Sequence, residues 1–288
     1  MARRRSRRIV VEQRGADRLT TALTARSARK LLDPQWWQHR CLRGVLGTIT
    51  HVVTESPLVA LTFDDGPDPV WTPRLLEILA ARDARATFFM LGRSAARHPD
   101  LVSAVVRGGH AIGNHSWDHP SFPLLRGAER RAQITRCARA LGGEGSRLLR
   151  PPFGQQNFAS RIDALLLGYQ VVTWNVVGWD WLRRGAERMA RELVDQIRPG
   201  SIVLLHDTLV DGGYSDGAYA PRDEMLTAVS TVIGTLAGTM EFVTVPELLA
   251  RGRPQRQAWL VTPSPSFAAH VRQRRTENTT LAGTTREG

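Results

Sequence analysis

Cysteine is scarce in this sequence of 288 residues, where only Cys41 and Cys137 occur. Two cysteines, one before the expected core and one inside it, exclude a disulfide framework and provide no zinc-finger spacing. Runs of about 18 apolar residues, which a membrane-spanning helix needs, are also missing. Residues 1–30 are charged and lack the apolar segment of a secretory signal, so we expect a cytoplasmic protein.

The positive charge of the chain is concentrated at its ends. The formal net charge is +12, and residues 1–50 carry 12 Lys and Arg against 3 Asp and Glu, whereas residues 51–250 carry 20 against 22. We expect the basic ends to be solvated, with weak attraction to anionic surfaces as the functional alternative. Aromatic residues do not alternate with the basic clusters, so we expect no specific nucleic-acid recognition.

Strand-like and helix-like segments alternate through the middle of the chain. The run "VALTF" precedes "TPRLLEILAARD", and "ATFFML" precedes "PDLVSAVVRG". Strands separated by helices of this length form βαβ units, so the pattern predicts an α/β fold with a mainly parallel sheet, a (β/α) barrel of about seven units. We expect a basic extension over residues 1–41, the folded domain over 42–250, and a disordered Pro/Arg/Thr-rich tail over 251–288.

Polar residues stand where the predicted strands end. In "LTFDDGP" an apolar run ends at two adjacent aspartates, and turn residues follow. The residues at or just after predicted strand ends are Asp64, Asp65, His115, Arg150, Asp180, His206 and Asp207. In a parallel α/β barrel these ends lie on one face, where active sites are built. Buried carboxylates in contact need a compensating cation or arginine, so the stretch predicts a metal ion.

The stretch "HSWDHP" places His115 and His119 four residues apart. On a helical turn both imidazoles could reach one ion, although such a pair alone is weak evidence. With Asp65 the two histidines make a set of two His and one carboxylate, which leaves open positions for water and substrate. His110 is more easily explained as a structural residue.

Six stretches occur in a fixed order that resembles a known family. They are "LTFDDGP", "ATFFMLG", "GGHAIGNHSWDHP", "LRPPFG", "WNVVGWDW" and "GSIVLLHD". Over about residues 45–250 they resemble the successive motifs of the NodB-type polysaccharide deacetylases, a carbohydrate esterase family. The resemblance implies a distorted (β/α) barrel, one divalent metal ion, and removal of N-acetyl or sometimes O-acetyl groups from sugars. For the metal we expect Zn²⁺, with Co²⁺ or another divalent ion as the alternative.

The resemblance also assigns a role to individual residues. It makes Asp64 the general base, Arg150 the residue that orients this base, His206 the general acid and Asp180 the residue that tunes the acid. The metal ligands that it implies are Asp65, His115 and His119. It assigns the oxyanion contact to the backbone N–H of Phe153, and the walls of the acetate pocket to Trp181 and Leu204. Hydrolysis of an amide needs these functions: an activated water, a stabilised oxyanion and a proton for the departing amine.

Several alternatives remain open from the residues. The same site could hydrolyse a non-sugar amide, because fold and metal do not fix the leaving group. The barrel could be a binding protein that has lost catalysis, or the basic extension could make the chain a membrane or nucleic-acid adaptor. Asp207 could hold its loop or touch substrate, Trp179 is expected in the core or an interface, and residues 211–217 form a turn-rich loop. We expect a monomer that acts on an acetylated carbohydrate.

Overall fold

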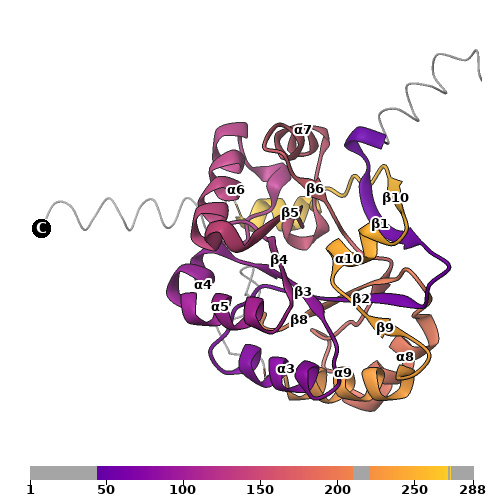
Figure 1. The fold of residues 1–288 in the computed structure, drawn as a ribbon. Coiled ribbons are helices and arrows are strands. Elements are labelled where there is room, and N and C mark those ends of the chain that lie inside the picture. The colour runs from indigo at the N-terminus through magenta and orange to yellow at the C-terminus, as the bar shows by residue number, and fades with distance from the viewer. Residues whose placement is uncertain (1–43, 210–220, 272, 274–288) are drawn as a thin grey trace, which may run out of the picture. The chain divides into compact units, whose positions relative to one another are not determined.

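The computed structural model describes residues 44–209, 221–271 and 273 (Figure 1). One sheet has eight strands in the order β6-β5-β4-β3-β2-β8-β7, with β9 paired to β2, and all of its pairs are parallel. Its strands are β2 (Leu58–Asp64), β3 (Ala86–Met90), β4 (Ala111–Asn114), β5 (Gly145–Leu149), β6 (Gln170–Val171), β7 (Val176–Val177), β8 (Ile202–His206) and β9 (Glu241–Phe242).

Helices connect most of these strands and cover the sheet. They are α3 (Trp71–Ala80), α4 (Gly92–Arg97), α5 (Pro99–Arg107), α6 (Gly127–Leu141), α7 (Phe158–Leu166), α8 (Ala186–Gln196), α9 (Asp223–Leu236) and α10 (Val245–Ala250). Three short 3₁₀ turns accompany them, at Phe122–Leu124, Gly142–Glu144 and Pro152–Gly154. Among the described residues, no helix is both long and apolar enough to cross a bilayer.

The alternation of side chains along β2 divides the core into two parts. Val59, Leu61 and Phe63 face a cluster that includes residues of α3, α5, α8 and α9, and α3 and α9 lie side by side along this region (Figure 1). Leu58 and Ala60 instead pack with residues of α10 and of the strand before β2. Because side chains alternate between the faces of a strand, Thr62 and Asp64 belong to this second, inner face.

The two edge strands of the large sheet are close neighbours in sequence. β6 ends at Val171 and β7 begins at Val176, and five residue steps span at most about 18 Å. The gap between them is bridged by β1 (Thr48–Val53), since the Thr173 N–H donates to the Ile49 carbonyl at 2.8 Å. The sheet therefore curls back on itself, which confirms the distorted, mainly parallel barrel expected from the sequence.

Residues 251–271 differ from the expected disordered tail. β10 (Arg253–Gln257) pairs antiparallel with β1, and Val261 forms an isolated antiparallel bridge with Gln156. The ordering comes from the partner rather than from apolar content, because β1 offers an edge that a polar strand containing Pro254 can pair with. The basic extension at 1–41 and the loop at 211–217 lie outside the described residues.

Candidate active site

The pairing of β2 with β8 creates the centre of the site. In this parallel pair Asp64 is the register partner of His206, the last residue of β8. His115 follows β4 directly and Arg150 follows β5 directly. The polar residues thus gather at the carboxyl ends of the strands, as the strand-end pattern predicts.

Asp65, His115 and His119 form a buried cluster. Asp65 Oδ1 lies 3.4 Å from His115 Nε2 and 3.3 Å from His119 Nε2, and one potential ligand atom from each residue falls within 4.8 Å of the others. Two ligand atoms about 2.1 Å from a shared tetrahedral centre stand about 3.4 Å apart. The spacing of these atoms therefore fits a single small divalent cation.

The hydrogen bonds of the cluster leave the ligand atoms of its histidines available. His115 Nδ1 lies 2.8 Å from the carbonyl oxygen of Arg150. A carbonyl only accepts, so Nδ1 carries the proton and Nε2 keeps the lone pair that a metal needs. Burial lowers the pKa of His119 to about 4, so its imidazole is neutral near pH 7. Burial opposes ionisation of Asp65, but His119 and His115 hold the pKa of this carboxyl below its ordinary value.

Two of these residues have unusual backbone conformations. Asp65 has φ of 78° and His119 has φ of 65°, in the left-handed region that non-glycine residues rarely adopt. Such strain is stored at sites where the surrounding structure imposes it. Here it turns both side chains toward His115, so the strain concentrates at the cluster itself.

Asp64 is held on the other side by a fully buried arginine. Arg150 Nη1 donates to Asp64 Oδ1 at 2.7 Å and also lies 2.7 Å from Thr62 Oγ1. The remaining guanidinium nitrogens donate to the carbonyls of Val172 and Thr173 at 3.3 and 2.8 Å. The second oxygen of Asp64 faces the cluster, 3.8 Å from His115 Nε2. Arg150 therefore orients Asp64, and the second carboxylate oxygen is directed toward the cluster.

His206 forms the opposite electrostatic arrangement. Its Nδ1 lies 3.0 Å from Asp180 Oδ1, and its backbone N–H donates to Asp180 Oδ2 at 2.9 Å. Burial disfavours the imidazolium, but the Asp180 carboxylate prevails and raises the pKa of His206 to about 9. Since the carboxylate fixes the proton on Nδ1, Nε2 holds the proton that can be transferred. The buried Arg222 also donates to Asp180, at 3.1 Å from Oδ2.

Comparison with known proteins agrees with this geometry. The signature of the family described as polysaccharide deacetylase matches residues 51–172. A chitooligosaccharide deacetylase from Azorhizobium caulinodans is 36% identical over 214 residues, which are 72% of this chain and 96% of that protein. The chain belongs to the polysaccharide deacetylase family. The resemblance predicted from six motifs is confirmed.

Two further polysaccharide deacetylases extend the comparison. A peptidoglycan-N-acetylglucosamine deacetylase from Bacillus cereus is 31% identical over 201 residues, 69% of this chain and 70% of that protein. A family 4 carbohydrate esterase from Streptomyces lividans, solved in complex with acetate, superimposes with a TM-score of 0.60 at 30% identity. That superposition covers 74% of this chain and 100% of the esterase. The likeness thus spans most of the described domain.

Two of the three residues that the deacetylase motifs assign to the substrate contact the site through their rings. The Phe153 ring centroid lies 4.4 Å from that of His119, and Trp181 meets His206 nearly perpendicularly with centroids 5.3 Å apart. Leu204 is buried in β8 as the register partner of Thr62. Phe153 also packs against Phe267, with centroids 5.2 Å apart, so the ordered C-terminal segment reaches the edge of the site.

Sequence reasoning missed other contributors to this deacetylase site. Thr62 could have been found, because the alternation along β2 makes it an inward-facing polar residue two positions before Asp64. The contact of Arg222 with Asp180 could not have been predicted, because no motif in the sequence around Arg222 indicates it. Of the two positions expected for Trp179, the core or an interface, the core is wrong, because 42% of the residue is exposed.

Asp207 holds its loop in place. Its Oδ2 accepts from Thr72 Oγ1 at 2.5 Å, and a Cβ at Gly66 would lie 2.2 Å from the same oxygen. Burial raises the pKa of Asp207 to about 7. The hydrogen bond connects the loop after β8 to the first turn of α3, and the loop after β2 packs closely against the same carboxyl, which favours the structural alternative for this residue.

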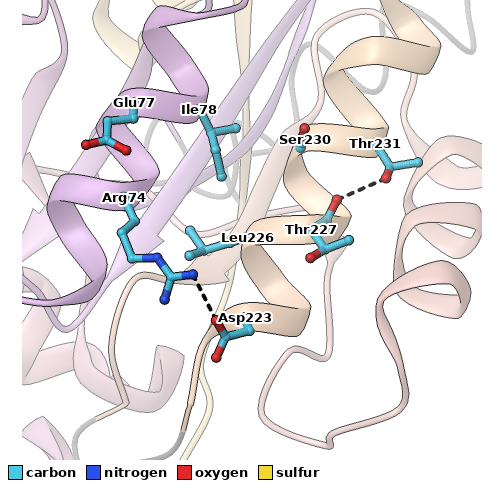
Figure 2. A pocket seen from close by; sticks show the side chains of 8 residues that line it. All are labelled: Arg74, Glu77, Ile78, Asp223, Leu226, Thr227, Ser230 and Thr231. Atoms are coloured by element: carbon cyan, nitrogen blue, oxygen red, sulfur yellow. Dashed lines mark hydrogen bonds and ion pairs between the residues drawn. The ribbon is translucent and has the colours of Figure 1, made fainter.

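A separate hollow lies between α3 and α9. Figure 2 shows the Arg74–Asp223 ion pair across it, at 3.0 Å, with both side chains about half exposed. None of the residues that line it belongs to the cluster or to its supporting hydrogen bonds. The hollow is a shallow, solvent-exposed feature of the surface formed by α3 and α9.

Proposed function

We propose that this chain is a metal-dependent deacetylase that hydrolyses N-acetyl groups of a carbohydrate, such as an oligosaccharide or a cell-envelope glycan. One observation carries the proposal: an Asp64–Arg150 pair and a His206–Asp180 pair flank the same Asp–His–His cluster. The relatives named for chitooligosaccharides and for peptidoglycan support a substrate built from N-acetylated sugars.

Asp65, His115 and His119 would hold the metal ion, for which we expect Zn²⁺, with Co²⁺ or another divalent ion as the alternative. Bound there, such an ion supplies Lewis acidity toward the acyl oxygen and the attacking water. Oxygen and imidazole ligands suit these ions, and His115 is already oriented by the Arg150 carbonyl. Phe153, next to His119, would direct its backbone N–H at the oxyanion.

Asp64 would take the proton of the attacking water. Its contact with Arg150 occupies one carboxylate oxygen, which leaves the other as the acceptor. His206 would then deliver its Nε2 proton to the departing nitrogen. An amine is expelled only when it is protonated, and a histidine with a pKa of about 9 is protonated at neutral pH. A histidine that is protonated at neutral pH therefore favours N-deacetylation over O-deacetylation.

Replacement of the base tests the proposal without disturbing the cluster. Asp64→Asn should abolish acetate release from N-acetylglucosamine oligomers while the purified protein still contains one equivalent of metal. The amide oxygen can still accept from Arg150, so the variant should fold. Normal turnover in this variant would refute the role of Asp64.

Replacement of a ligand gives the complementary result. His119→Ala should lower both metal content and activity, because it removes one of three ligands. His98→Ala is the matched control, since His98 lies outside the cluster at the junction of α4 and α5. A panel that adds cyclic amides to the acetylated sugars distinguishes sugar deacetylation from hydrolysis of a non-sugar amide.

A further inference from the structure

Trp179 presents a large apolar ring to solvent from a strained backbone. Its φ is 52° and 42% of the residue is exposed. A glycine would satisfy this conformation without strain, and burial in a core does not account for the side chain. An exposed indole held in such a conformation indicates a contact that the protein makes with another molecule.

The loop that carries Trp179 is fixed on both sides of it. The Gly178 N–H donates to the Leu204 carbonyl at 2.9 Å, and a Cβ at Gly178 would lie 2.4 Å from the Leu205 side chain. The Leu182 N–H donates to the Trp179 carbonyl at 3.0 Å, and Arg222 Nη2 donates to the Asp180 carbonyl at 2.7 Å. The indole is therefore positioned before any ligand arrives, which reduces the entropy lost on binding.

Trp179 is continuous with the candidate active site. Its ring lies 5.2 Å from that of Trp181, centroid to centroid, at an interplanar angle of 54°. Trp181 in turn lies 5.3 Å from the imidazole of His206. Trp179 is thus one ring removed from the proposed general acid.

We propose that Trp179 binds a second pyranose ring, adjacent to the sugar whose acetyl group is removed. This inference rests on the proposed function, because it assumes that the reacting group belongs to a sugar. A pyranose presents an apolar face of C–H groups, and an indole offers a rigid apolar surface of similar size. Exposed aromatic rings with few polar groups are typical of the lining of ligand sites. The chain is therefore selective for oligosaccharides over single N-acetylated sugars.

Two substitutions separate the ring from the backbone that carries it. Trp179→Gly removes the indole and suits the positive φ, so its effect does not come from added strain. Trp179→Tyr keeps an aromatic face. Leu166→Ala is the matched control, because Leu166 is a 74% exposed apolar residue at the end of α7.

The first measurement is kcat/KM for acetate release from the monomer and the tetramer of N-acetylglucosamine. In Trp179→Gly the loss for the tetramer should exceed the loss for the monomer by about tenfold, the effect of one aromatic contact. Trp179→Tyr should recover most of it, and Leu166→Ala should match the unmodified chain. Equal losses on both substrates, or no loss on the tetramer, would overturn the inference.

The second measurement does not depend on turnover. Calorimetric titration of the full chain with the fully deacetylated tetramer should show binding that Trp179→Gly weakens by about tenfold. If the unmodified chain releases no acetate but this binding persists, the proposed function fails and the sugar contact stands. If Trp179→Gly instead changes the mass of the protein in solution and leaves saccharide binding intact, the ring belongs to an interface between copies and the inference is wrong.

Discussion

Substitution of Asp180 should lower the pH above which activity is lost. His206 has an ordinary pKa of 6.5, and Asp180 raises it to about 9 against the effect of burial. Asp180→Asn keeps an oxygen that can accept from His206 Nδ1 but removes the charge. The pKa of His206 should then fall toward 6.5, because only the weaker attraction of Asp65 and Asp64 still opposes burial.

The size of the effect follows from the two protonation states. At about pH 7.5 a group of pKa 9 is more than about nine-tenths protonated, whereas a group of pKa 6.5 is about one-tenth protonated. Loss of the acid form alone should therefore lower kcat/KM about tenfold at this pH. The remaining activity should rise as the pH falls toward 6.

The free energy of unfolding, like the activity, should decrease as the pH rises. A histidine whose pKa is raised on folding stabilises the protein fully below about pH 6.5, and this contribution is lost as the pH rises through about 9. In Asp180→Asn the free energy of unfolding should depend less on pH, which chemical denaturation between about pH 6.5 and pH 9 can measure. It should also destabilise the protein at every pH, since Arg222 loses a charged partner.

A buried aspartate elsewhere provides the control. Asp163 pairs with Arg130 and Arg131 and contacts none of the site residues. Asp163→Asn should lower stability but leave the pH profile of kcat/KM unchanged. If Asp180→Asn keeps the alkaline limit near pH 9, the carboxylate does not set the charge of His206 and the reasoning is refuted.

Three further outcomes follow from the site. A chelator should abolish acetate release, and Zn²⁺ or Co²⁺ should restore it; activity that survives complete metal removal would contradict the metal assignment. Gly66→Ala should lower the free energy of unfolding by about 1–3 kcal/mol, measured with urea, because its Cβ would lie 2.2 Å from Asp207. Phe267→Ala should lower stability by about 1 kcal/mol through the lost contact with Phe153, and should lower kcat with metal content unchanged; an unaltered kcat would show that Phe153 is positioned without it.

Local patterns were sufficient to predict the strands and their polar ends. The run from Leu58 to Phe63 reads as a buried strand because both of its faces are covered, and the aspartates that end it meet the residues that follow β4 and β5. Parallel strands place their carboxyl ends together, so convergence of residues far apart in sequence could be inferred before any contact was known.

Long-range pairing was not predictable in this way. The segment Arg253–Gln257 has no apolar alternation, and its order depends on β1, about 200 residues earlier in the chain. Arg222 likewise reaches Asp180 only through the folded arrangement of the loops after β7 and β8. The exposure of Trp179 escaped prediction because a tryptophan beside a buried aspartate is compatible with either a core or a surface position.

The buried charges of the site alternate in sign, and this order explains how its acid and base coexist. Arg222 faces Asp180 and Asp180 faces His206, while Arg150 faces Asp64. Burial lowers the pKa of Arg150, so the guanidinium is retained through Asp64 and its hydrogen bonds to carbonyls. In the proposed mechanism each pair would support one role: Arg150 orients the carboxylate that would accept a proton, and Asp180 favours the imidazolium that would give one, across one strand pair. Two adjacent aspartates are tolerated because they face different partners: Asp64 pairs with Arg150, whereas Asp65 faces the two imidazoles of the cluster, where a bound cation would compensate its charge.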